Sequence, residues 1–392
     1  MKILAIREAT VPIGAAMSNA AIAFDSMTAS ALAIVTDRTQ DGKPVTGYAF
    51  DSIGRYGKGA LLRERFIPRL LAASPDSLLD DSGLIAPEAC WRAAMANEKD
   101  GGHGERPGAI GLLDAALWDA RAKLERKPLW RCLADHYPDC ATGASPAISL
   151  YGSCGHYRPG RTSDVLDSLA AEVKRASDAG YPLVKIKLGG NNIADDAARV
   201  EAASRALGGR IAVDANGRLD ASIADAWLDR MAQLDVAWVE EPASALDYAA
   251  LGRYASQARL PIATGENLFS FDDARNLLRY GGLQKERDRV QVDVLLAYGV
   301  PEYVRILREY RAAGWAHSAF VPHAGHLFAA HLVAAFGLGM HEAAPDASLP
   351  YGGLWDGTAV SDGRTSIPAH EGAGYETKKN LYAILQPLSA PH

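Results

Sequence analysis

The pattern of apolar and polar positions changes character within the first half of this 392-residue chain. Apolar and β-branched residues first alternate or run together in residues 2–13 and 29–37, as they do in strands. Asp41 followed by Gly42 is a hairpin signal between extended segments. Helical spacing of apolar residues comes next, most clearly in residues 109–127. Residues 1–135 are therefore predicted to form an α+β domain.

Beyond this domain, short apolar runs alternate with amphipathic stretches. Such alternation favours a parallel sheet whose strands are joined by right-handed helical crossovers. The predicted strands are residues 146–153, 182–188, 210–216, 236–241, 260–266, 289–295 and 318–323. Residues 136–355 are therefore predicted to form an α/β barrel of the TIM type. Residues 356–392, where the alternation stops, are expected to pack back on the first domain.

Acidic residues end three of these predicted strands at equal intervals. Asp214, Glu240 and Glu266 follow one another in steps of 26 residues. One strand, one crossover helix and two short loops require roughly 30 residues, so each step fits one βα unit. Polar groups at the carboxyl ends of successive strands are typical of the catalytic face of a (β/α)8 barrel.

Three carboxylates brought together at that face would repel one another strongly unless a cation lay between them. Ligands that are all oxygen atoms favour Mg²⁺, or alternatively Mn²⁺, over Zn²⁺. The alternative is that each acid only caps the helix that follows it. The even register of three acids, with Asn216 beside the first, favours the metal site, and Asn216 is a candidate for substrate binding.

Two lysines lie on the predicted strand that comes before Asp214. Lys185 and Lys187 are two positions apart, so their side chains face the same side of a strand. Two neighbouring cations depress each other's pKa, and a neutral lysine can act as a base. The alternative, a solvated edge strand, fits poorly because the surrounding residues are apolar.

A histidine and an aspartate end the last two of the predicted strands. Asp293 lies 27 residues after Glu266, and His323 follows 30 residues later. A carboxylate on an adjacent strand can orient an imidazole and raise its proton affinity. His323 and Asp293 therefore form a candidate acid/base pair, although His323 could instead be a satisfied polar residue. His326 is a rival for the same role.

Further candidates for substrate binding lie at the end of the barrel and in loops of the first domain. Glu342 follows a predicted eighth strand and either contacts a substrate oxygen or supports the other ligands. Lys99 and His103 lie in a glycine-rich charged stretch, and Arg55 lies in a second one. Solvated loop charges are the alternative interpretation of these three residues.

Composition limits the partners. The formal net charge of −6 and the pI near 5.9 give no basic excess for nucleic acid. No apolar run is long enough to span a bilayer, and the four cysteines form no C-x-x-C pair. These features favour a cytoplasmic protein that acts on a small molecule, and local cations must hold any anionic ligand.

The motifs "KIK", "VDAN", "VEEP", "GEN", "QVD" and "PHAGH", preceded by "ALWDARAKLERKPL", occur in this order. Together they closely resemble the enolase superfamily in its mandelate racemase-like branch. The resemblance implies a modified TIM barrel, (β/α)7β, with an α+β capping domain completed by the C-terminal segment. It implies that Asp214, Glu240 and Glu266 bind Mg²⁺ and that Lys187 and His323 are acid/bases on opposite faces. It also implies that Lys185 tunes Lys187 or touches the substrate carboxylate, and that the protein is a homo-oligomer.

Within that branch, stretches such as "NEKDGGHGER" and "LPYGGLWDG" resemble the D-tartrate dehydratases, although Ile53 and Ala324 depart from that pattern. The resemblance implies a Mg²⁺-dependent dehydratase of a hydroxy-carboxylate acid sugar. Such an enzyme removes the proton α to a carboxylate, and loss of the β-hydroxyl gives a 2-keto acid, here D-tartrate to oxaloacetate. A racemase or epimerase with the same two bases, a Schiff-base aldolase and a non-catalytic sugar-acid-binding protein are the alternatives.

Overall fold

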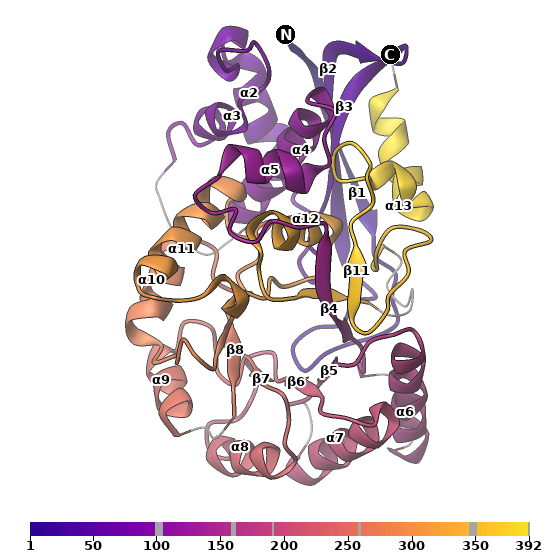
Figure 1. The fold of residues 1–392 in the computed structure, drawn as a ribbon, viewed down its shortest axis with the longest axis vertical. Helices are drawn as coiled ribbons and strands as arrows, with labels where there is room; N and C mark the ends of the chain where they lie inside the picture. The colour runs from indigo at the N-terminus through magenta and orange to yellow at the C-terminus, as the bar shows by residue number, and fades with distance from the viewer. Residues whose placement is uncertain (99–104, 158–161, 190–191, 258–259, 345–350, 391–392) are drawn as a thin grey trace.

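The computed structural model describes residues 1–98, 105–157, 162–189, 192–257, 260–344 and 351–390. Figure 1 shows two parts: an antiparallel sheet with its helices at one end, and a ring of parallel strands and helices at the other. Lys99 and His103, two of the expected substrate-binding residues, lie outside the described residues.

The N-terminal part is built on a three-stranded antiparallel sheet, with strands β1 (Ile3–Pro12), β2 (Thr28–Gln40) and β3 (Lys43–Phe50) in that order. The predicted hairpin is confirmed, since Asp41 and Gly42 connect β2 to β3 with φ of 50° and 76°. Positive φ at both central residues is what a two-residue turn of type I′ requires.

Helices cover one face of this sheet. They are α1 (Gly59–Leu61), which continues through the π-helical residues Leu62–Phe66 into α2 (Ile67–Ala72), then α3 (Pro87–Ala94), α4 (Arg106–Leu124) and α5 (Leu129–His136). The predicted helix over residues 109–127 is α4, and almost all of it is buried. Its backbone comes so close to β3 that a Cβ on Gly47 would lie 2.1 Å from the carbonyl oxygen of Ala116. Only glycine permits that approach.

The parallel strands of the barrel are hydrogen-bonded in the order β10, β4, β5, β6, β7, β8, β9. They are β4 (Ala147–Ser153), β5 (Val184–Lys187), β6 (Ala212–Asp214), β7 (Val239–Glu240), β8 (Ile262–Thr264), β9 (Arg289–Val290) and β10 (His341–Ala343). The outer helices are α6 (Thr162–Asp178), α7 (Ile193–Leu207), α8 (Ala224–Gln233), α9 (Tyr248–Gln257), α10 (Phe271–Tyr280), α11 (Val300–Ala312) and α12 (Leu327–Phe336).

Two predicted strands are shorter than expected. Only Arg289–Val290 of residues 289–295 is a strand, because the chain turns at Asp293, whose carbonyl accepts hydrogen bonds from the Leu296 and Ala297 amides. Residues 318–323 form no regular strand. Phe320 nevertheless makes a parallel bridge to Val290 and accepts a hydrogen bond from the Gly339 amide at 2.9 Å. This stretch therefore lies between β9 and β10 and brings the sheet round towards closure.

The C-terminal segment contacts both parts of the molecule. Strand β11 (Arg364–Ser366) pairs antiparallel with β4 of the barrel. Helix α13 (Lys379–Leu385) lies beside the N-terminal sheet (Figure 1), and Arg7 of β1 donates a hydrogen bond to the Leu388 carbonyl at 2.7 Å. Among the helices of the described residues, none has both the length and the apolar character needed to cross a membrane.

Candidate active site

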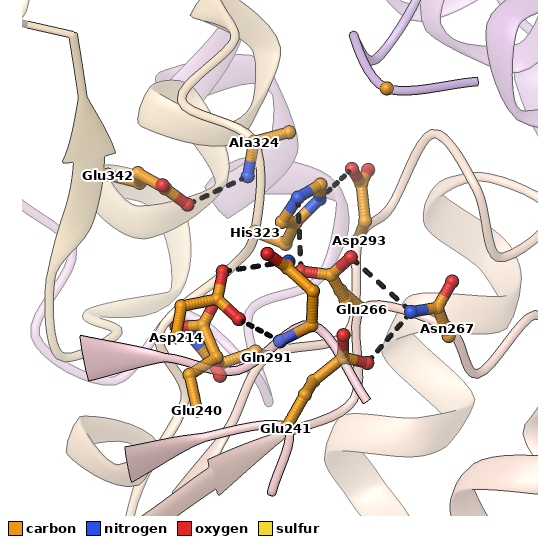
Figure 2. A network of polar contacts seen from close by, with 12 residues as sticks. Asp214, Glu240, Glu241, Glu266, Asn267, Gln291, Asp293, His323, Ala324 and Glu342 are labelled. Carbon is orange, nitrogen blue, oxygen red and sulfur yellow. Dashed lines mark hydrogen bonds and ion pairs between the residues drawn. The ribbon is translucent and has the colours of Figure 1, made fainter. Parts of the chain in front are cut away.

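The three regularly spaced acids converge at the carboxyl ends of neighbouring strands. Asp214 ends β6 and Glu240 ends β7, and these two residues are partners in the parallel pairing of the two strands. Glu266 follows β8. One carboxylate oxygen from each lies within 4.8 Å of the others, and all three side chains are buried. Figure 2 shows them pointing towards a common centre. We call Asp214, Glu240 and Glu266 the carboxylate trio.

The two lysines of β5 face the carboxylate trio, as the spacing in a strand predicts. Lys187 Nζ lies 2.5 Å from Asp214 Oδ2. Lys185 is fully buried beneath the trio, where it contacts Glu240 Oε1 and lies 3.1 Å from Glu342 Oε1. Lys187 belongs to the described lining of the cavity at this site, whereas Lys185 does not. This placement suits Lys185 to offset negative charge rather than to touch a substrate.

The expected effect of Lys185, which lowers the pKa of Lys187, is present, but other charges outweigh it. Burial lowers the pKa of Lys187, but the nearby carboxylates, Asp214 above all, outweigh burial and hold that pKa above its ordinary value. The pKa of Lys185 is likewise raised, because Glu240 and Glu342 outweigh the effect of its burial. The sequence pattern placed the two cations together correctly but underestimated how many acids surround them.

The predicted histidine–aspartate pair is formed at the other end of the trio. His323 Nδ1 lies 3.1 Å from Asp293 Oδ2, and His323 Nε2 lies 3.3 Å from Glu266 Oε2. Burial lowers the pKa of His323, but Glu266 and Asp293 outweigh burial and the pKa is raised. His326, the rival candidate, also contacts Asp293, with its Nε2 at 3.2 Å from Oδ1.

Three further candidates line the same cavity, which has a volume of 90 Å³. Asn216 Nδ2 donates to Asp214 Oδ2 at 3.0 Å, and Glu342 Oε2 accepts from the Ala324 amide at 3.1 Å. Arg55 reaches in from the N-terminal part, where its Nη2 lies 3.5 Å from Glu266 Oε1. The described lining therefore brings together Arg55, Lys187, Asn216, Glu266, His323 and Glu342.

Sequence reasoning missed several polar residues around the trio. Gln291 Nε2 donates to Glu240 Oε2, and Asn267 Nδ2 donates to Glu241 Oε1 at 2.8 Å (Figure 2). Ser52 Oγ donates to Asp293 Oδ2 at 2.6 Å. The position of Gln291, two residues before Asp293, is a signal that could have found it, because alternate strand residues share a face. No comparable local signal points to Ser52.

The electrostatics of the trio fit a hard divalent cation. Burial raises the pKa of Glu240 to about 7. The charge of Lys185 lowers this pKa, whereas the charges of Asp214 and Glu342 raise it further. Burial and the charge of Glu266 raise the pKa of Glu241 well above its ordinary value. Asn216 Oδ1 is buried and accepts no hydrogen bond from the residues that the structure describes, and Glu266 Oε2 faces His323 Nε2 at 3.3 Å. Concentrated carboxylate charge with an unused oxygen acceptor is the environment that Mg²⁺ prefers.

A second group of potential metal ligands does not fit a cation. Side-chain atoms of Glu125, Cys132 and His136 lie within 4.8 Å of one another. Glu125 Oε1 already accepts from Arg121, and its Oε2 accepts from Lys127 at 3.0 Å. Burial also raises the pKa of the Cys132 thiol, which therefore stays protonated and is a poor ligand.

Comparison with known proteins shows the family of this chain. Residues 168–381 match the family described as enolase C-terminal domain-like. The chain is 29% identical over 284 residues to L-talarate/galactarate dehydratase of Salmonella typhimurium (strain LT2), and the match covers 72% of this chain. It is 27% identical over 259 residues to 3,6-anhydro-alpha-L-galactonate cycloisomerase of Streptomyces coelicolor, covering 64% of this chain. In both comparisons the chain spans 65% of the relative's own length.

Among solved structures, a racemase from Streptomyces coelicolor A3(2) with bound magnesium has a TM-score of 0.75 at 22% identity. The match covers 97% of this chain and 99% of that one. The expected fold, a modified barrel with an N-terminal antiparallel cap, is confirmed over nearly the whole chain. This neighbour and others of the same fold contain magnesium.

Proposed function

This chain belongs to the enolase superfamily, and we propose that it is a Mg²⁺-dependent acid-sugar dehydratase. One observation carries the proposal: a lysine and a histidine flank the carboxylate trio at its two ends and line one cavity. Lys187 contacts Asp214, and His323 lies beside Glu266. An amine and an imidazole in these positions can move two protons on one bound substrate, which elimination of water requires.

Asp214, Glu240 and Glu266 would hold the Mg²⁺. When bound, the cation would offset the charge that develops on the substrate carboxylate, a contribution of several kcal/mol, and would lower the pKa of Lys187 by drawing on the charge of the trio. Lys185 and Gln291, which are not part of the described lining of the cavity, contact Glu240 and hold that ligand in place. Outer contacts of this kind orient metal ligands.

The residues of the chain divide the proton transfers between them. Lys187 Nζ accepts the proton from the carbon α to the carboxylate, and the C–H electron pair passes into the α–β bond. His323 Nε2 donates a proton to the β-hydroxyl, whose C–O bond breaks, and water leaves. The enol that remains tautomerises to a 2-keto acid. Asp293 accepts from His323 Nδ1 and so keeps Nε2 directed to the substrate.

A dicarboxylate acid sugar is the substrate class that we propose, with D-tartrate, which would give oxaloacetate, as the best single candidate. The motif resemblance supports D-tartrate, and the relative that acts on L-talarate and galactarate supports acid sugars more broadly. Arg55 supports a second carboxylate, because its guanidinium lies at the cavity 3.5 Å from Glu266 Oε1. A guanidinium in this position matches carboxylate geometry.

The test is a screen of the purified protein with Mg²⁺ against mono- and diacid sugars, including D-tartrate, L-talarate and galactarate. Formation of a 2-keto acid from at least one of them is the expected result. If no acid in the panel gives a 2-keto product, the proposal of dehydratase activity is wrong.

A racemase or epimerase is the second candidate. The placement of Lys187 and His323 at opposite ends of the trio favours it, because two bases facing one carbon can invert it. The same screen separates the two reactions. Inversion at the α-carbon without a 2-keto acid assigns the racemase, whereas a 2-keto acid assigns the dehydratase.

A further inference from the structure

A short segment of the N-terminal part, residues 51–55, reaches the histidine end of the site. Ser52, which is fully buried, donates its hydroxyl to Asp293 Oδ2 at 2.6 Å. Arg55, three residues later, reaches Glu266 and Asn267. The contact between Ser52 and Asp293 joins residues 241 positions apart in the chain. A group from outside the barrel therefore touches the carboxylate that orients His323.

The carboxylate of Asp293 accepts four hydrogen bonds from the described residues, two on each oxygen. Oδ2 accepts from Ser52 Oγ and His323 Nδ1, and Oδ1 accepts from His326 Nε2 and from the Leu295 amide at 2.8 Å. Burial would raise the pKa of Asp293, but the two imidazoles outweigh burial and hold that pKa well below its usual range. The carboxylate is therefore ionised and acts only as an acceptor.

The two histidines on Asp293 have different roles. His326 Nδ1 accepts from the Ala329 amide at 3.0 Å, as the N-cap of α12, so its proton sits on Nε2 and points at Asp293. Both ring nitrogens of His326 are thus used inside the protein. His323 Nδ1 contacts Asp293, whereas His323 Nε2 lies at the cavity, 3.3 Å from Glu266 Oε2. This difference excludes His326 as the rival acid/base. The orientation of His323 therefore depends on the position of the Asp293 carboxylate.

The position of Ser52 is fixed by its neighbour in the sequence. Asp51 Oδ1 accepts from Lys58 Nζ at 2.8 Å, and both side chains are 1% exposed. Asp51 Oδ2 accepts from the Ser30 amide at 2.8 Å, and the Asp51 amide donates to the Ser30 carbonyl at 3.0 Å. Breaking a buried, hydrogen-bonded ion pair is strongly unfavourable. The ion pair with Lys58 and the hydrogen bonds to Ser30 of strand β2 therefore hold the backbone next to Ser52 in place.

We propose that Ser52 is a positioning residue that holds Asp293, and through it His323, in the geometry that protonates the departing hydroxyl. Its catalytic consequence rests on the function proposed above. The lysine end of the site needs no such help, because Lys187 is part of strand β5 and its contacts with the trio lie within the barrel. Removing the Ser52 hydroxyl should therefore weaken the second proton transfer and spare the first.

The experiment compares Ser52→Ala with Ser270→Ala in the Mg²⁺-loaded protein. Ser270 is a matched control, since it is also a buried serine with a hydroxyl bonded to an aspartate, Asp273, but it lies outside the site. In D₂O, exchange of the substrate α-proton reports on Lys187, and 2-keto acid formation reports on His323. We expect Ser52→Ala to slow dehydration about tenfold, the effect of losing one hydrogen bond to a charged group, and to leave exchange unchanged. Ser270→Ala should change neither rate.

A second measurement needs no turnover. In protein labelled with ¹⁵N-histidine, the His323 Nδ1–H signal, assigned by its loss in His323→Asn, should shift or broaden in Ser52→Ala and stay in place in Ser270→Ala. The proposal is overturned if the signal does not move in Ser52→Ala, or if exchange and dehydration fall together. If the wild-type protein forms no 2-keto acid at all, the proposed function fails, while the histidine signal still decides the role of Ser52.

Discussion

The two ends of the candidate active site are built differently. The lysine end lies on strand β5, whose backbone is fixed by pairing with β4 and β6, and both lysines contact carboxylates of the barrel. The histidine end lies on irregular segments after β9 and before α12, and Asp293 there depends on Ser52 from the N-terminal part. A group on a strand is positioned by the sheet itself, whereas a group on a loop needs contacts from elsewhere in the chain.

Replacing the base at the lysine end should have the largest effect. We expect Lys187→Ala to abolish both α-proton exchange and 2-keto acid formation, with a loss of at least about 10³-fold, in the range typical of general acid–base groups. Exchange followed by ¹H NMR in D₂O measures this directly. If exchange persists in Lys187→Ala, the residue that removes the α-proton lies at the histidine end, and the roles assigned to the two ends are wrong.

Mg²⁺ affinity should depend on the carboxylate trio and not on the histidine end of the site. Glu240→Gln should weaken Mg²⁺ binding by more than about tenfold, since even outer contacts of metal ligands contribute that much. Asp293→Asn is the matched comparison and should leave Mg²⁺ affinity nearly unchanged. Titration calorimetry with Mg²⁺ measures both variants. Equal weakening in the two would mean that Asp293 belongs to the metal site.

Acid should destabilise the helix that supports the histidine end. In the folded protein, burial lowers the pKa of His331 on α12 to about 3. Neutral His331 accepts from the Trp130 amide at 3.0 Å and contacts the Ala373 carbonyl at 3.2 Å. The unfolded chain has the ordinary pKa near 6.5 and binds the proton first, so stability is complete above that pH and falls below it.

Between pH 7 and pH 5, protonation of His331 in the unfolded chain should by itself lower the free energy of unfolding by about 2 kcal/mol. Urea unfolding at the two pH values measures the loss, and His331→Gln should remove this part of the pH dependence. An unchanged pH dependence in His331→Gln would show that His331 is not the responsible group.

The smallest expected effect concerns the backbone next to His323. Ala324 has a φ of 83°, a left-handed conformation that favours glycine, and its amide donates to Glu342. Ala324→Gly should therefore raise the free energy of unfolding by about 1 kcal/mol. Denaturant unfolding at pH 7 tests this, and a lower free energy of unfolding for the variant would contradict the strain at this position.

The contrast between groups on strands and groups on loops also explains which parts of the site the sequence could predict. The strand-borne groups, from Lys187 to Glu266, follow a regular apolar pattern, so their spacing predicted both the barrel and the convergence of the trio. Near Asp293 and His323 the pattern predicted regular strands where the chain instead turns or forms a single bridge.

Two features of the site had no signal in the local sequence. The contact of Ser52 with Asp293 exists only because the N-terminal part packs on the barrel, and no local periodicity encodes a contact of that range. Strand periodicity also placed Lys185 and Lys187 on one face but could not give their different depths in the barrel. The net rise in the pKa of Lys187 had no local signal either, because it depends on how many carboxylates meet in space.

The most direct test of the division of labour between the two ends is α-proton exchange in His323→Asn. The variant is incubated in D₂O with Mg²⁺ and an acid sugar that the wild-type protein dehydrates, and ¹H NMR follows the α-proton while 2-keto acid is assayed. We predict that the α-proton signal disappears while no 2-keto acid forms. Retention of the α-proton signal would contradict the assignment of Lys187 as an independent base served by the carboxylate trio.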